Sequence, residues 1–336
     1  MLLESMRHPL YLHIGHGKVG SSSIQQALAR DLDALRRAEF LVADRKMEFC
    51  EGGPMDGSAN RYFRDLNALG HDAPADVDQR MHRALQQLAE RPRKLVISAE
   101  ALVSPGIERL ASELRRAFEV HVIYYVRRQE DWLVSAWGEW GCQEGLMLDA
   151  YCERALQTGQ PDFLGVVEAW RPHADTMRVR PLHPSALVGG DLVSDFYDAV
   201  GFEGPVSTAP RGREATDLAM LEVFRDSSSL FEDEHDNRLR DWLLEHLPDG
   251  YPRERVHLAP EMAGRVAAHF EPVNRELHAR WFPDVDYDLV FGPRPDADER
   301  AAAHAGQQGV AAELTRLRRV VGLQLHLLHR LHARPD

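Results

Sequence analysis

Short apolar runs alternate with segments of helical spacing along the first half of the chain. Each run is short enough for a strand, and the run at residues 120–126 is apolar almost throughout, as expected of a strand covered on both faces. The alternation predicts an α/β fold with a mainly parallel sheet flanked by helices. The predicted strands are residues 10–14, 39–43, 94–98, 120–126 and 177–180.

The segments between these strands carry apolar residues three and four positions apart, the spacing of helices that pack on a sheet. Beyond residue 190 the chain becomes mostly helical, and a proline-containing stretch at residues 293–297 indicates a boundary. We therefore predict a main domain over residues 1–297 and a helical tail over residues 298–336. The predicted helices are residues 24–38, 60–69, 77–90, 107–118, 130–143, 192–200, 216–247 with a break, and 261–281.

A glycine-rich segment, G-H-G-K-V-G-S-S-S over residues 15–23, joins the first strand to the first helix. Glycines let backbone N–H groups approach an anion, the helix N-terminus adds partial positive charge, and Lys18 adds a full one. These are the parts of a phosphate cradle. The alternative without a binding role is a glycine turn before a helix, with Lys18 in solvent. In a nucleotide-triphosphate P-loop the lysine follows the last glycine, whereas here it precedes Gly20.

A second polar constellation follows the apolar run at residues 120–126. Arg127 stands at the predicted strand end, and Ser135 lies eight positions later on the next helix. In open α/β sheets, ligands bind beyond the carboxyl ends of the strands, and an arginine fork suits phosphate oxygens. Arg128 is the alternative arginine. Taken alone, the pattern also fits a charged helix start.

Charge and composition exclude several classes of protein. A net charge of −13 over 336 residues argues against a general nucleic-acid binder, although a local pocket can still be positive. The 3 cysteines form no C-x-x-C pair, so neither a zinc knuckle nor a disulfide framework is indicated, and a reducing compartment is expected. The first residues lack the apolar stretch of a signal peptide, and no run is long enough to span a membrane, so we expect a cytoplasmic location.

Taken in order, these motifs resemble those of bacterial sulfotransferase-family proteins. That family carries L-H-I-G-x-x-K-x-G-[ST]-[ST]-S-I-Q, a strand ending S-x-E, then R-R-Q-x-x-W-x-x-S, V-R-P followed by D-F, and a late F-x-x-x-N-x-x-L. Val19 departs from the threonine that the family often has there. The resemblance covers about residues 10–292, and the motifs fall at residues 12–25, 98–100, 127–135, 179–196 and 270–277.

The resemblance implies a P-loop-like domain that transfers a sulfuryl group from 3′-phosphoadenylyl sulfate, with no metal ion, to an acceptor hydroxyl on a carbohydrate, glycolipid or small metabolite. Lys18 would act in catalysis as well as in binding. A P-loop kinase or NTPase is the alternative enzyme, and a catalytically inactive nucleotide-binding scaffold is the alternative of another class. The donor-binding residues implied are His16, Gly17, Lys18, Val19, Gly20, Ser21, Ser22, Ser23, Arg127 and Ser135.

An acceptor hydroxyl needs a general base, and three residues are candidates. Glu100 comes first because it follows the third strand, where the cytosolic branch of the resembled family places its catalytic histidine. Asp44, after the second strand, is the runner-up, because other branches have a carboxylate there. His16, inside the loop, is third. Glu100 fits equally well as a surface carboxylate that caps the next segment.

The tail is locally basic within an acidic chain and carries a leucine-rich stripe interrupted by Gln324. Such a stripe normally finds a partner. We expect self-association, ahead of docking on an acidic face of the chain's own domain and of contact with an anionic membrane. The stripe consists of Leu314, Leu317, Val321, Leu328 and Leu331.

Overall fold

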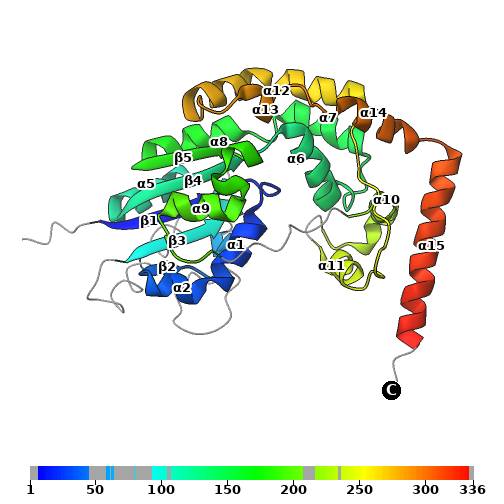
Figure 1. Cartoon of the computed structure of the whole chain (residues 1–336), viewed down its shortest axis with the longest axis horizontal. Coiled ribbons are helices and arrows are strands. Elements are labelled where there is room, and N and C mark those ends of the chain that lie inside the picture. The colour runs from blue at the N-terminus through cyan, green and yellow to red at the C-terminus, as the bar shows by residue number, and fades with distance from the viewer. Residues whose placement is uncertain are drawn as a thin grey trace, which may run out of the picture. The chain divides into compact units, whose positions relative to one another are not determined.

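The computed structural model describes residues 7–44, 58–60, 62–63, 79, 93–103, 107–206, 216–233 and 236–332. It contains a 5-stranded sheet, parallel throughout, with the order β2-β3-β1-β4-β5 and helices on both sides (Figure 1). The predicted α/β fold with a mostly helical C-terminal half is confirmed. The strands are β1 (His8–Ile14), β2 (Phe40–Val42), β3 (Lys94–Ala99), β4 (Phe118–Val126) and β5 (Thr176–Pro181).

The chain divides into two compact units, and the first contains the whole sheet. This first unit combines Met1–Arg128 with Asp162–Gly212 and Val273–Val290. Its main helices are α1 (Ser21–Arg30), α2 (Leu32–Arg37), α5 (Glu108–Ala117), α8 (Phe163–Trp170), α9 (Leu192–Val200) and α13 (Tyr287–Val290), with a short 3-10 helix η2 (Glu100–Val103).

The second unit is helical in the part that the structure describes, and combines Gln129–Pro161 with Arg213–Pro272 and Phe291–Asp336. Helix α12 (Pro260–Trp281) begins in this unit and ends in the first. The predicted tail falls within the second unit, and the predicted boundary after residue 297 stays a prediction. The other main helices are α6 (Gln129–Ala136), α7 (Leu148–Thr158), α10 (Leu218–Asp226), α11 (Arg238–Glu245), α14 (Ala297–Gly306) and α15 (Val310–His332).

Two adjacent tyrosines of β4 show how the sheet is covered. Successive side chains of a strand point to opposite faces. Tyr124 packs edge-on against Phe163 of α8, with ring centroids 6.2 Å apart, whereas the Tyr125 hydroxyl donates to Asp195 of α9 at 2.7 Å. Helices α8 and α9 therefore cover opposite faces, which explains why β4 is apolar almost throughout.

The carboxylate of Asp195 is fully buried, and both of its oxygens accept hydrogen bonds. It accepts hydrogen bonds from the Tyr125 hydroxyl, from the Val188 amide at 3.0 Å, and from the guanidinium of Arg180 on β5. Burial, and next the Asp195 charge, raise the pKa of Tyr125. A buried carboxylate stabilises a fold only when it is paired and hydrogen-bonded, and this one ties α9 to two neighbouring strands.

Several predicted elements differ in extent from those observed. The helix predicted over residues 24–38 is divided at Asp31 into α1 and α2, and α6 ends at Ala136, where a π-helical turn, Trp137–Gly141, continues it. Helices α7 and α8 were not predicted, although Gly159 in a left-handed conformation and the Asp162 N-cap are signals for their ends. The helices predicted over residues 60–69 and 77–90 lie largely outside the described residues.

The described residues include no helix that combines the length and the apolar character needed to cross a membrane.

Replacing the buried carboxylate of Asp195 tests its role in the fold. We expect Asp195→Asn to lower the free energy of unfolding by about 3 kcal/mol, because the Arg180 guanidinium loses its buried counter-charge. Asp198→Asn is the matched control, because Asp198 lies 3.8 Å from the same guanidinium and its side chain is 53% exposed; its loss should stay below about 1 kcal/mol. Urea unfolding followed by circular dichroism measures both, and equal losses would contradict the assignment.

Candidate nucleotide-binding site

The candidate site lies at the carboxyl edge of the sheet, where β1 ends. Ile14, its last residue, pairs with Ala99 of β3 on one side and with Tyr124 of β4 on the other. From β1 the chain continues to β2, at one edge of the sheet, and from β4 it continues to β5, at the opposite edge. The ends of β1 and β4 therefore form a topological switch point, the place where open α/β sheets bind ligands.

The loop after β1 adopts an unusual backbone conformation at Lys18. Its φ is 70°, in the left-handed region that side chains other than glycine avoid at a cost of about 1–2 kcal/mol. The Arg127 guanidinium, which follows β4, donates from Nη1 to the Lys18 carbonyl at 2.9 Å. The two predicted constellations thus meet at this bond. Backbone strain held by surrounding structure is typical of ligand-binding loops.

Gly20 closes the loop and serves as the N-cap of α1, with φ 92°. Its carbonyl accepts from the Ser23 amide at 2.9 Å, which turns the chain into the helix. A Cβ at this position would lie 2.2 Å from Leu192 of α9. The left-handed backbone conformation therefore favours glycine at this position, and a side chain there would also displace the Leu192 methyl group.

Helix α9 holds α1 at both ends. Leu192 packs over Gly20, and the Tyr197 hydroxyl donates to the Asp31 carboxylate, just beyond the last residue of α1, at 2.9 Å. Asp195 lies on the same helix and ties it to the sheet. The position of the N-terminus of α1 therefore depends on a network whose members lie far apart in the sequence.

The serines at the start of α1 differ in exposure. Ser21 is 2% exposed, and its hydroxyl has no hydrogen-bond partner among the described residues. Ser22 is exposed, and Ser23 is half-buried. A helix N-terminus leaves its first amides without intrahelical acceptors and carries partial positive charge. A buried, unpaired hydroxyl beside such amides is chemistry that fits a phosphate oxygen.

Two buried histidines belong to this segment: His13 of β1 and His16 of the loop contact elements on opposite faces of the sheet. The Nδ1 of His13 is 2.8 Å from the Ser98 hydroxyl, which also accepts from Gln25 of α1 at 3.3 Å. The Nδ1 of His16 is 2.7 Å from the Tyr124 hydroxyl. Burial lowers the pKa of His13 to about 3 and that of His16 to about 4. Both imidazoles are therefore neutral near pH 7, which makes His16 a weak general base.

The two carboxylates proposed as the base follow different strands. Glu100 is the first residue of η2, directly after β3, and β3 is a neighbour of β1. Asp44 follows β2, which is separated from β1 by β3. Neighbouring strands lie about 4.8 Å apart, so β3 lies directly beside β1, whereas β2 lies about 10 Å from it. Both side chains are half-buried.

The remaining residues of the predicted site differ in how deeply they are buried. Val19 is fully buried and Gly17 is half-buried. Arg128 is half-buried and directly follows Arg127. Ser135 is half-buried on α6, in the second unit, so its pairing with Arg127 stays a prediction.

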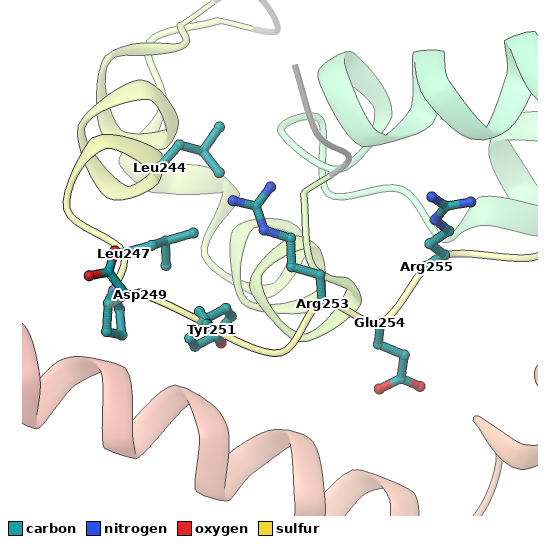
Figure 2. Close-up of a pocket in the computed structure, with 9 residues that line it drawn as sticks. Leu244, Leu247, Asp249, Tyr251, Arg253, Glu254 and Arg255 are labelled. Carbon is teal, nitrogen blue, oxygen red and sulfur yellow. The ribbon is translucent and has the colours of Figure 1, made fainter. Parts of the chain in front are cut away.

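A pocket of about 610 Å³ lies in the second unit, and none of the predicted site residues lines it (Figure 2). Its two arginines are accompanied by two carboxylates, so it lacks the one-sided positive charge expected of a phosphate site. Its lining residues are Leu244, Leu247, Pro248, Asp249, Gly250, Tyr251, Arg253, Glu254 and Arg255.

No known family and no curated protein matches the chain. Among solved structures, the chain is similar to one described as "Sulfotransferase Domain from the Curacin Biosynthetic Pathway", with a TM-score of 0.33 and 13% identity over 79% of this chain and 98% of that one. A likeness at that level carries no conclusion about what this chain binds or catalyses.

The buried histidines predict acid sensitivity of the fold. Unfolded histidines bind protons below about pH 6.5, whereas His13 and His16 remain neutral in the folded chain down to about pH 3 and 4. Between these limits the unfolded state binds more protons, so stability is full above about pH 6.5 and falls as the pH falls. The loss approaches about 1.4 kcal/mol per pH unit for each histidine.

Urea unfolding between pH 4.5 and 7 measures this slope. The amide of His16→Asn can still reach the Tyr124 hydroxyl. We expect this variant to take up about one proton fewer on unfolding, which makes the slope of stability against pH shallower. His269→Asn is the control, because His269 is exposed on α12. A slope for His16→Asn that matches the parent protein would contradict the assignment.

Proposed function

We propose that this protein is a sulfotransferase that uses 3′-phosphoadenylyl sulfate as donor. The observation that carries the proposal is the bond from Arg127 to the Lys18 carbonyl, which joins a strained, lysine-bearing loop to the strand end at the switch point of the sheet. The order of lysine and glycine in this loop, and the motif order along the chain, favour sulfuryl transfer over a P-loop NTPase.

The residues around the loop fit a donor that carries a phosphosulfate and a second phosphate. Lys18, the Ser21 hydroxyl and the N-terminus of α1 suit the 5′ phosphate, because they combine a full charge, an unpaired donor and a helix end. Arg127 and Ser135 are proposed for the 3′ phosphate, with Arg128 as the alternative. The further residues proposed to line the donor site are His16, Gly17, Val19, Gly20, Ser22 and Ser23.

The donor supplies an activated sulfuryl group whose leaving group is a phosphate. The acceptor oxygen forms a bond to sulfur while the bond from sulfur to the bridging oxygen breaks, so negative charge develops on the leaving phosphate. Lys18 and the α1 N-terminus are proposed to stabilise that charge, as positioned electrostatics do in phosphoryl transfer. Glu100 is proposed to take the proton of the acceptor hydroxyl. The proposed acceptor is a hydroxyl of a carbohydrate, glycolipid or small metabolite.

Nucleotide binding tests the donor. By calorimetry we expect adenosine 3′,5′-bisphosphate to bind more tightly than AMP or ATP, because only the bisphosphate has a 3′ phosphate for the proposed contact with Arg127. Arg127→Ala should reduce the preference for the bisphosphate over AMP by about 1.5–3 kcal/mol, the scale of a charged hydrogen bond.

Comparing the two nucleotides separates two roles of Arg127. If Arg127 only braces the Lys18 carbonyl, Arg127→Ala lowers the affinity for the bisphosphate and for AMP equally, and the preference for the bisphosphate is retained. Loss of the preference in Arg128→Ala instead would move the 3′ contact to that residue. No preference in the parent protein, or tight binding of ATP with Mg²⁺-dependent hydrolysis, would overturn the proposed donor.

Turnover with labelled donor and a panel of hydroxyl acceptors tests the base. We expect Glu100→Gln to lower turnover roughly 100-fold with donor affinity nearly unchanged, because a general base acts in the transition state and not in donor binding. Asp44→Asn is the matched control and should keep near-parent turnover. The reverse pattern would assign the base to Asp44, and no transfer to any acceptor would favour an inactive scaffold.

A further inference from the structure

Helix α15 carries an exposed apolar stripe along one side. Val310 is 71% exposed, Leu314 48%, Leu317 51% and Val321 51%. These positions are separated by four, three and four residues, which keeps them on one face of an α-helix. We propose that this stripe pairs with the same stripe of a second copy of the chain, as a parallel two-stranded coiled coil.

The opposite side of α15 is already committed to its own unit, where the helix contacts α10 (Figure 1). Arg316 pairs with Glu222 at 2.6 Å and also donates to the Gln307 carbonyl at 2.9 Å. Arg319 pairs with the fully buried Asp217 at 3.2 Å and with Glu254. At about 100° per residue these arginines point away from the stripe. The ion pairs therefore fix which side of α15 is turned outward.

The stripe has the heptad spacing of a coiled coil. With heptads written abcdefg, Leu314 and Val321 take position a, and Val310 and Leu317 take position d. The next d position is Gln324, which is exposed, and the sequence continues the pattern with Leu328 and Leu331. A polar residue at one core position fixes the register of two helices, and the pattern extends over about three heptads.

The charges beside the stripe favour a parallel arrangement of two copies. Glu313 stands at position g and Arg318 at the position e that follows it, and both are exposed. In a parallel pair, position g of one helix faces the following position e of the other. Glu313 of each copy would therefore face Arg318 of the other copy, which gives two ion pairs. In an antiparallel pair e faces e, where α15 has Ala311, Arg318, Leu325 and His332, and Arg318 finds no carboxylate. This complementarity makes a second copy the occupant.

Light scattering over a concentration series tests the pairing on the full chain. We expect the parent protein to approach twice its 38.1 kDa mass at high concentration. Leu317→Glu should remain monomeric, because it places a charge at the core of the seam. Thr315→Glu, at an exposed position of the same helix outside the stripe, should still pair. Circular dichroism checks that both variants stay folded.

Disulfide trapping tests the orientation. In a parallel pair the two copies of residue 310 face each other, so Val310→Cys should form a cross-linked dimer under mild oxidation, whereas Thr315→Cys should not exceed the parent protein. Among the described cysteines, Cys142 and Cys152 are buried, and the parent protein gives the background.

Three results would overturn the proposal. A parent protein that stays monomeric at every concentration removes the pairing. A Leu317→Glu variant that still dimerises would show that the dimer forms through another surface. Co-sedimentation of a monomeric parent protein with phosphatidylserine vesicles, lost in Leu317→Glu, would assign the stripe to a membrane surface instead.

Discussion

The buried carboxylate of Asp195 links the sheet to the helices that shape the candidate site. It is fully buried and accepts from Tyr125 on β4, Arg180 on β5 and the Val188 amide. A charge in that position would be costly without these donors, so the network also specifies where α9 lies. Because α9 packs over Gly20 and bonds to Asp31, the same carboxylate determines the position of α1.

The loop after β1 adds local strain to this global constraint. Lys18 is left-handed although its side chain disfavours that conformation, and the guanidinium of Arg127, which follows β4, donates to its carbonyl. If Arg127 binds phosphate and braces the loop at once, then binding of one end of the donor and the shape of the cradle at the other are coupled. This gives a physical reason for two motifs 109 residues apart to occur together.

The strand pattern, the parallel sheet and the glycine-rich turn were predictable because each depends on local periodicity or on glycine conformation. Arg180 and Asp195 belong to the V-R-P and D-F motifs, yet their pairing could not be predicted from the sequence, because it depends on how β5 and α9 pack. Nor could the left-handed Lys18 be foreseen, since local preference opposes it. Divided helices such as α1 and α2 were missed because one apolar stripe runs through both.

The tail shows how one helix can serve two surfaces in an acidic protein. Its arginines favoured docking on an acidic face of the chain's own domain, and Arg316 and Arg319 are paired with carboxylates of the same unit, with side chains 10% and 16% exposed. Their charge therefore stabilises the placement of α15 rather than remaining available to an outside partner. Once the basic side faces inward, the apolar side must face outward, and the exposed charges that remain among the described side chains of α15 are Glu313 and Arg318. That pattern is self-complementary only between parallel copies, so the internal ion pairs and the external seam follow from one constraint on the rotation of the helix.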